Sequence, residues 1–147
     1  MEKFNISKDT RELIDAIFNL RLCMKQYIQR KIREDQIDLT YEMLQVLTVL
    51  WRTGHSNQQE IANRIQKNKA SLTSLLDNLT KRNLIIRTED PSDRRNKIIS
   101  LTKIGREYEI QFKPILDGFY QSIQEGLSKE KLIEVTNVLK VMQDNLA

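Results

Sequence analysis

The sequence contains very few of the residues that build disulfides, metal sites and nucleophilic active sites. Among its 147 residues there is one cysteine, Cys23, and one histidine, His55. A single cysteine excludes a disulfide within the chain and is typical of a reducing compartment. A single histidine excludes a histidine-cluster metal site, and no nucleophile and base can be paired around it. There is no glycine-rich phosphate loop either, so we expect no catalytic residues, no metal, no cofactor and no enzyme.

Glycine, proline and long apolar runs are also scarce. Only four glycines and two prolines interrupt the chain, which favours a mostly helical protein. No apolar run approaches the roughly 20 residues that a membrane span requires, and residues 1–5 do not resemble a signal peptide. We therefore expect a cytoplasmic protein without a membrane partner. A chain of 147 residues suits a single domain over residues 1–147, which buries about 68–70% of its unfolded surface.

Two short helical patterns in the middle of the chain predict a helix-turn-helix. The first places three apolar side chains on one helical face: Ile61, Ala62 and Ile65. The second has leucines at i, i+3, i+4 and i+7, the spacing of an amphipathic helix: Leu72, Leu75, Leu76 and Leu79. Polar residues 66–68 separate the two patterns, and Asn68 can cap the second helix. Two short helices joined by a tight polar turn form a helix-turn-helix motif.

The face of the second helix opposite its leucines is suited to a DNA major groove. It carries short polar side chains, a methyl group and lysines: Lys69, Ala70, Ser71, Thr73, Ser74, Asn78 and Lys81. Hydroxyls and amides bond base edges, a methyl meets the thymine methyl, and lysines reach phosphates. The same composition also fits an ordinary solvated helix face, so this face alone does not separate the two interpretations.

A predicted hairpin follows this helix directly. Residues 84–88 and 97–101 are rich in β-branched side chains and are bounded by breakers, so they predict paired strands. The charged connection, residues 89–96, is too long for a tight hairpin. Arg94 and Arg95 at such a tip can enter the narrow minor groove of DNA, and we count Lys97 with them. The alternative is a solvated loop with Asp93 as a local partner.

The charge distribution supports contact with nucleic acid. Residues 52–106 contain 12 lysines and arginines against 5 acidic residues, a net charge of +7. The remainder holds 12 against 15, or −3, and the two sum to the +4 of the whole chain. A basic middle between mildly acidic ends is the pattern of a nucleic-acid-binding module on a scaffold that does not contact the nucleic acid.

Long helical patterns at both ends of the chain predict a second copy as partner. A helix from about Ile6 runs for about seven turns with apolar residues on more than one stripe, so more than one surface must cover it. Thr102 can cap a helix after the hairpin, which Pro114 should kink or interrupt, and a last helix opens at Ser128. Between the first helix and the helix-turn-helix, Thr40 and Gly54 should bound one more helix.

Three motifs together resemble the MarR family of bacterial winged-helix regulators. Residues 93–105 fit the family's wing pattern D-x-R-x-x-x-x-x-L-T-x-x-G, residues 60–62 resemble its E-[LI]-A, and residues 39–44 resemble its L-T-x-x-[QE]-[FWML]. The length and the order of the elements match as well. Two places differ: Gln66-Lys67 replaces a frequent glycine and apolar residue in the turn, and Asn83 replaces a glycine before the first wing strand.

The resemblance implies a mostly α (α+β) fold: a winged helix-turn-helix with long N- and C-terminal helices that form a dimerisation domain. It places the DNA-binding lobe at 40–101 and the dimerisation helices at 1–36 and 102–147. It implies a homodimeric, sequence-specific transcriptional repressor that lies in the bacterial cytoplasm and is associated with the nucleoid. Its two recognition helices would bind an inverted repeat of double-stranded DNA about 34 Å apart, and a ligand or modification would relieve repression. The alternative is a winged-helix protein-interaction module without operator specificity.

Two further predictions concern small molecules and the cysteine. An effector pocket is expected where the dimerisation helices meet the winged lobe, with five candidates that each fit plain core packing individually: Met24, Tyr27, Met43, Leu47 and Phe112. Some relatives sense peroxide with a thiol in the first helix, but that thiol lies about two turns further upstream than Cys23. We therefore expect Cys23 to be buried and inert.

Overall fold

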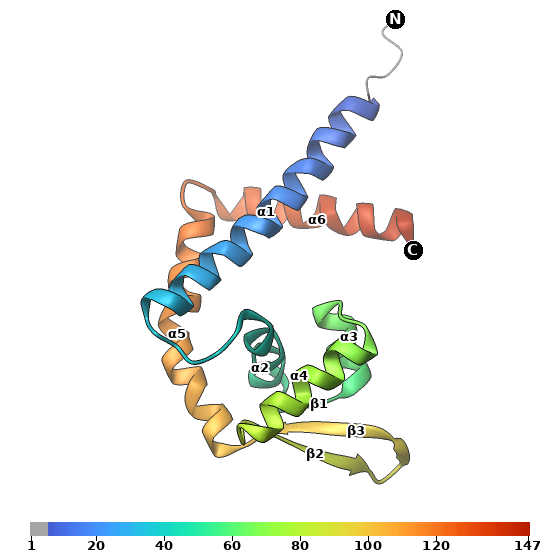
Figure 1. Ribbon diagram of the computed structural model, residues 1–147. Helices are drawn as coiled ribbons and strands as arrows, with labels where there is room; N and C mark the ends of the chain where they lie inside the picture. Colours follow the sequence, from blue (N-terminus) through green and yellow to red (C-terminus); the bar gives the residue numbers. More distant parts are fainter. Residues whose placement is uncertain (1–5) are drawn as a thin grey trace, which may run out of the picture. The chain divides into compact units, whose positions relative to one another are not determined.

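The computed structural model describes residues 6–147, and their side chains from residue 8 onward. These residues form α1 (Ile6–Glu34), α2 (Tyr41–Thr53), β1 (His55–Asn57), α3 (Gln58–Ile65), α4 (Lys69–Lys81), β2 (Ile85–Asp90), β3 (Asp93–Leu101), α5 (Lys103–Gln124) and α6 (Lys129–Leu146) (Figure 1). The mostly helical winged helix-turn-helix predicted from the sequence is confirmed. The chain divides into two compact units, one ending at Phe112 and the other beginning at Lys113.

Short polar residues define the helix ends, as the sequence predicts. The Thr40 hydroxyl accepts a 3.1 Å hydrogen bond from the backbone N–H of Met43, which caps α2. Gly54 ends the helix with φ of 78°, and its N–H donates to the Leu50 carbonyl at 2.7 Å. A residue in this left-handed region is most often glycine because a Cβ is disfavoured there.

The sheet has the strand order β1-β3-β2, and both pairings are antiparallel. Its hairpin is longer than predicted: only Pro91 and Ser92 connect β2 to β3. The Asp90 carboxylate accepts hydrogen bonds from the N–H and the hydroxyl of Ser92 at 2.9 and 2.7 Å, which closes a tight turn. The prediction of a long irregular connection over residues 89–96 was therefore wrong.

The first strand was not predicted. His55 begins β1 and pairs with Ser100. The strand contains only three residues, which is too short for alternation of side chains to be recognised in the sequence.

The junction between the wing and α5 explains the L-T-x-x-G pattern. The Thr102 hydroxyl donates to the Asn83 carbonyl at 2.6 Å and accepts from the N–H of Gly105 at 3.0 Å, so the predicted cap is confirmed. A Cβ at Gly105 would overlap the carbonyl oxygen of Leu84. Glycine is required here because two backbone segments approach each other closely.

The core of the first unit joins α2, the helix-turn-helix, the base of the wing and the first part of α5. Its largest fully buried side chains are Val46, Leu47, Leu50, Ile61, Leu72, Leu76, Leu79, Leu84, Ile85, Ile99 and Phe112. Trp51 is half-buried at the edge of this core, and its ring centroid lies 6.0 Å from that of Phe112.

The terminal helices bury little apolar surface within the described chain. Of the kink or interruption predicted at Pro114, the interruption does not occur, because α5 continues through this residue. Ser128 caps α6, as predicted, by accepting from the N–H of Lys131 at 3.1 Å, yet no residue of α6 is buried. None of the described helices is long and apolar enough to span a membrane.

Cys23 is exposed, so the prediction of a buried thiol was wrong. The described part of α1 buries only Ile28 and Ile32, both near its C-terminal end. Cys23 precedes that end, in a part of the helix that leaves large apolar side chains uncovered in a single chain.

Candidate nucleic-acid interface

The helix-turn-helix is shaped by two asparagine caps and one left-handed residue. Asn57 caps α3 by accepting a 2.8 Å hydrogen bond from the backbone N–H of Glu60. Asn68 caps α4 in the same way, accepting a 2.8 Å hydrogen bond from the backbone N–H of Ser71. Gln66 ends α3 with φ of 55° and ψ of 45°. The turn therefore adopts left-handed backbone geometry with glutamine at a position where glycine is favoured.

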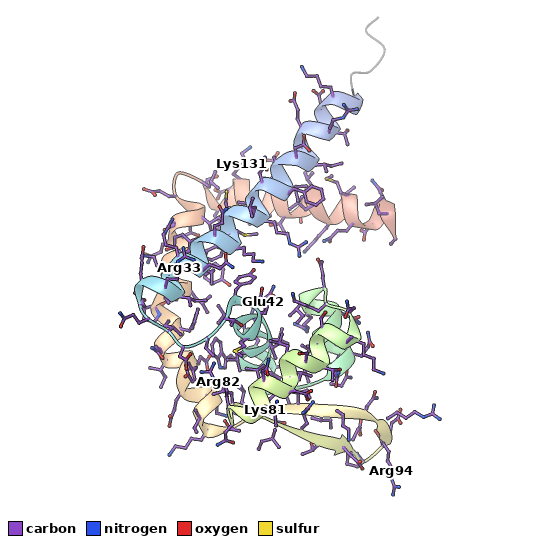
Figure 2. All side chains as sticks on the ribbon, viewed as in Figure 1. Arg33, Glu42, Lys81, Arg82, Arg94 and Lys131 are labelled. Atoms are coloured by element: carbon purple, nitrogen blue, oxygen red, sulfur yellow. The ribbon has the colours of Figure 1, made fainter. Side chains whose placement is uncertain are left out.

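Most of the predicted groove-reading face of α4 is open to solvent. Leu72, Leu76 and Leu79 are fully buried and orient the helix. Six of the seven predicted DNA-binding residues of α4 are exposed: Lys69, Ala70, Ser71, Ser74, Asn78 and Lys81. In Figure 2, Lys81 marks the C-terminal end of this helix.

Thr73, the seventh, is half-buried and bonded within the protein. Its hydroxyl donates to the Lys69 carbonyl at 2.8 Å and accepts from the amide of Gln58 at 3.0 Å. Since a hydroxyl has a single proton, Thr73 has none left to donate to a base. Gln58 was missed by sequence reasoning because no helical or strand period relates residues 15 positions apart.

The tip of the wing carries two arginines with free side chains. Arg94 and Arg95 are exposed, and neither guanidinium has a partner among the residues that the structure describes. The Asp93 carboxylate accepts instead from the backbone N–H of Arg95 at 3.0 Å, so Asp93 orders the backbone and leaves the guanidinium groups free. Figure 2 shows Arg94 at the far end of the hairpin.

Ion pairs distinguish the other cations of the wing. Lys97 lies 3.5 Å from the Glu89 carboxylate across the hairpin, which reduces its availability to a phosphate. Arg87, which sequence reasoning did not single out, pairs with Asp77 of α4 at 2.6 Å. This second pair connects the wing to α4 and neutralises a carboxylate on the helix proposed to enter DNA.

A groove of about 350 Å³ brings the start of α4 and the wing together. Four cationic residues line it, from the turn, from α4 and from β3: Lys67, Lys69, Arg95 and Lys97. Three of these are predicted DNA-binding residues, now adjacent in space although Lys69 and Arg95 are far apart in the sequence. Such a concentration of positive charge favours a polyanion.

The predicted effector residues are buried or half-buried in the described part of the chain. Met43, Leu47 and Phe112 are buried, and Met24 and Tyr27 are half-buried. A cavity of about 360 Å³ lies instead between α1, α2 and the turn after α3, and none of these five residues lines it. Its lining includes Phe18, Arg21, Lys25, Tyr41, Gln45 and Lys67.

Comparison with known proteins agrees with this geometry. The family model described as "MarR family" matches residues 39–97. The repressor MdtR of Bacillus subtilis is 32% identical over 122 residues, which cover 77% of each chain. The chain belongs to the MarR family. The regulator FarR of Neisseria gonorrhoeae is 27% identical over 105 residues, covering 71% of this chain and 72% of FarR.

A solved structure extends the similarity to almost the whole chain. The complex of S. aureus MepR with DNA matches with a TM-score of 0.71 and 29% identity, covering 97% of this chain and 99% of MepR. This MarR-family chain is thus a DNA-binding transcriptional regulator and not an enzyme.

Proposed function

We propose that the protein is a homodimeric repressor that binds an inverted-repeat operator. Two copies of α4 enter successive major grooves on one face of the duplex, and two wing tips enter the flanking minor grooves. Residues 40–101 form the DNA-binding lobe, and residues 1–36 and 102–147 supply the dimerisation helices. The observation that carries this proposal is that α6 buries no residue within its own chain.

The uncovered apolar surface supports a second copy as partner. Large exposed apolar side chains on α1 are Leu13, Ile14, Ile17, Phe18, Leu20 and Leu22. Those from the end of α5 through α6 include Tyr120, Ile123, Leu127, Leu132, Ile133, Val135, Val138, Leu139 and Val141. Extended apolar surfaces of this kind mark interfaces, and most homodimers pair the same surface of two subunits by two-fold symmetry.

The open cations and polar groups described above support operator binding. Lys69 and Lys81 lie near the two ends of α4, with Ala70, Ser74 and Asn78 between them, an arrangement that suits phosphates on either side of base edges. MdtR is named a repressor and MepR is seen bound to DNA. Occlusion of a promoter by a dimer is the simplest mode of action for this chain.

We also propose that a small molecule relieves repression. The cavity between α1, α2 and the turn of the helix-turn-helix supports this proposal. A ligand bound there would contact both α1, a dimerisation helix, and Lys67 in the turn. Arg21 and Lys67 provide positive charge, and Phe18 an apolar ring. Burial raises the pKa of Tyr41 above its ordinary 10.0, although Arg21 lowers it in part, so the phenol stays a neutral donor. A partly apolar anion fits this lining.

Selection from random duplexes tests the proposal. The expected result is an enriched inverted repeat whose half-sites are about one helical turn apart. The solution mass should equal two subunits of 17.4 kDa. A flat selection would support the alternative, a winged-helix module without operator specificity, and a mass of one subunit would contradict the dimer.

A further inference from the structure

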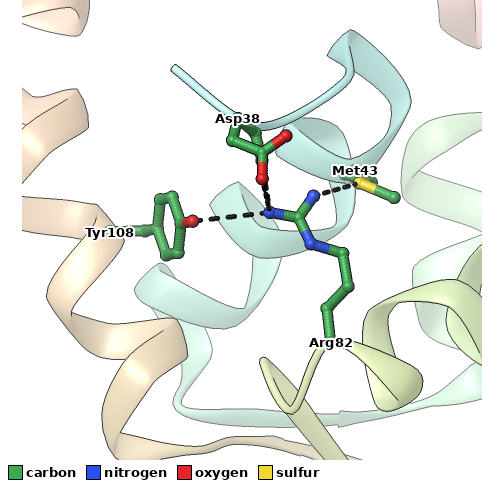
Figure 3. A network of polar contacts seen from close by, with 4 residues as sticks. All are labelled: Asp38, Met43, Arg82 and Tyr108. Atoms are coloured by element: carbon green, nitrogen blue, oxygen red, sulfur yellow. Dashed lines mark hydrogen bonds and ion pairs between the residues drawn. The ribbon is translucent and has the colours of Figure 1, made fainter. Parts of the chain in front are cut away.

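The side chain of Arg82 connects the end of the recognition helix α4 to other parts of the first compact unit. Arg82 is the C-terminal cap of α4, and its backbone N–H donates to the Asn78 carbonyl at 3.1 Å. Its side chain is only 29% exposed, although most arginines are on the surface. Figure 3 shows the guanidinium directed toward Asp38, Met43 and Tyr108.

Three residues hold this guanidinium. Nη2 donates to Oδ2 of Asp38 at 3.0 Å, to the backbone carbonyl of the same residue, and to the Tyr108 hydroxyl at 3.4 Å. Nη1 lies 3.4 Å from Sδ of Met43. Because the Asp38 side chain is 91% exposed, its charge alone contributes little. The planar guanidinium donates to several acceptors in fixed directions. This geometry fixes the position of the Arg82 side chain relative to its three partners.

The partners of Arg82 are themselves held in place. Asp38 lies in the loop between α1 and α2, where the neighbouring Ile37 and Leu39 are 6% and 5% exposed. Met43 is buried in α2, and Tyr108 is half-buried in the first part of α5. The C-terminal end of α4 is therefore fixed to the α1–α2 loop and to the base of α5.

The two ends of α4 are attached to different elements. At its start, Asn68 caps the helix and the Thr73 hydroxyl accepts a hydrogen bond from Gln58 of α3. This end of α4 is therefore attached to the other helix of the helix-turn-helix. At its end, Arg82 attaches the helix to elements that lead directly into the proposed dimerisation helices. The buried leucines pack α4 into the core, and this second attachment connects its end to the α1–α2 loop and to the first part of α5.

We propose that Arg82 is a positioning residue that sets the direction of α4 and thereby the spacing between half-sites that the dimer accepts. This inference rests on the homodimer proposed above. Adding one base pair between half-sites moves one of them by about 3.4 Å and rotates it by roughly a tenth of a turn. A dimer with firmly held recognition helices rejects such an operator, and one with loosened helices tolerates it.

The experiment compares the affinity of the full chain for three kinds of duplex. These are the selected operator, operators with one or two base pairs added or removed between half-sites, and a single half-site. R82A is the test variant, and Tyr108→Phe removes one partner only. Arg33→Ala is the matched control, since it removes an exposed guanidinium that has no partner among the described residues. If R82A does not fold, Arg82→Lys keeps the charge but loses the fork.

We expect R82A to bind the single half-site like wild type while its penalty for altered spacing falls about two- to thirtyfold, the range of mutational effects on coupling between sites. Y108F should change the penalty in the same direction by less, and R33A should leave it unchanged. An unchanged penalty in R82A, or an equal loss of single half-site binding, overturns the role of Arg82. A wild type without any preferred spacing overturns instead the homodimer proposal on which it rests.

Discussion

The indole nitrogen of Trp51 donates a 3.0 Å hydrogen bond to the carbonyl oxygen of Gly105, 54 residues further along the chain. This contact joins α2 to the first turn of α5. Thr102 joins the same turn to the end of α4, through the Asn83 carbonyl. Gly105 therefore lies where three parts of the first unit converge.

Replacing Gly105 by alanine should destabilise the fold. The added Cβ overlaps the Leu84 carbonyl, and backbone cannot move aside as a flexible side chain can. We expect the free energy of unfolding to fall by at least about 1–3 kcal/mol, the usual cost of overpacking. Urea denaturation measures it, with the exposed neighbour Lys103→Ala as control. Equal midpoints for G105A and wild type would contradict the close approach.

Replacing Gln66 by glycine should stabilise the protein. Left-handed backbone costs a non-glycine residue about 1–2 kcal/mol, whereas glycine loses roughly 0.5–1 kcal/mol more than alanine on ordering. The expected net gain is about 0.5–1 kcal/mol, seen as a higher midpoint of thermal unfolding. Asn83→Gly is the comparison: Asn83 has φ of 57° but tolerates it better, so its gain should be smaller. A Q66G variant less stable than wild type would contradict this account of the turn.

The wing cations should differ in their contribution to DNA binding. Arg95→Ala should weaken specific binding by about 1–3 kcal/mol, the scale of one good base contact. Lys97→Ala should cost less because Glu89 already pairs with Lys97. Titration of each variant with labelled operator at constant salt measures both effects. If K97A loses as much binding free energy as R95A, the ion pair with Glu89 does not reduce the contribution of Lys97 to DNA binding.

The hydroxyls of Thr73 and Ser74, neighbours on α4, should contribute differently to operator binding. The Ser74 hydroxyl is exposed and has no partner among the described residues, whereas that of Thr73 is already bonded on both sides. Ser74→Ala should weaken operator binding by about 0.5–1.5 kcal/mol, the value of one hydrogen bond. Thr73→Val should change it by less than about 0.5 kcal/mol, although the protein itself loses the Gln58 contact. Greater sensitivity at Thr73 would show that its hydroxyl reaches the DNA.

The sequence predicted features that depend on neighbouring residues. The caps Thr40, Asn68 and Ser128 and the leucine face of α4 follow from local hydrogen bonding and helical period, and the structure confirms them. Exposure of Cys23 could not be predicted in this way. It depends on what lies beside α1, and the helical period does not specify that.

The missed site residues have long-range partners. Arg82 bonds to Asp38, which is 44 positions away in the sequence. Arg87 of β2 forms an ion pair with Asp77 of α4, so its partner lies in a different element. No periodic pattern connects such pairs, so Arg82 looks like one more surface cation in the sequence. The length of the wing was missed for a different reason: a single carboxylate, Asp90, allows the chain to reverse within two residues.

The two-residue reversal at Pro91-Ser92 restricts how the wing can be re-engineered. Successive side chains of a strand alternate between the two faces of its sheet. Inserting one residue between Arg95 and Ile98, which pairs with both neighbouring strands, would therefore turn Arg95 to the opposite face, while an insertion of two would preserve its face and extend the hairpin. Variants built for a longer or shorter reach should thus alternate between functional and inactive as residues are added one by one.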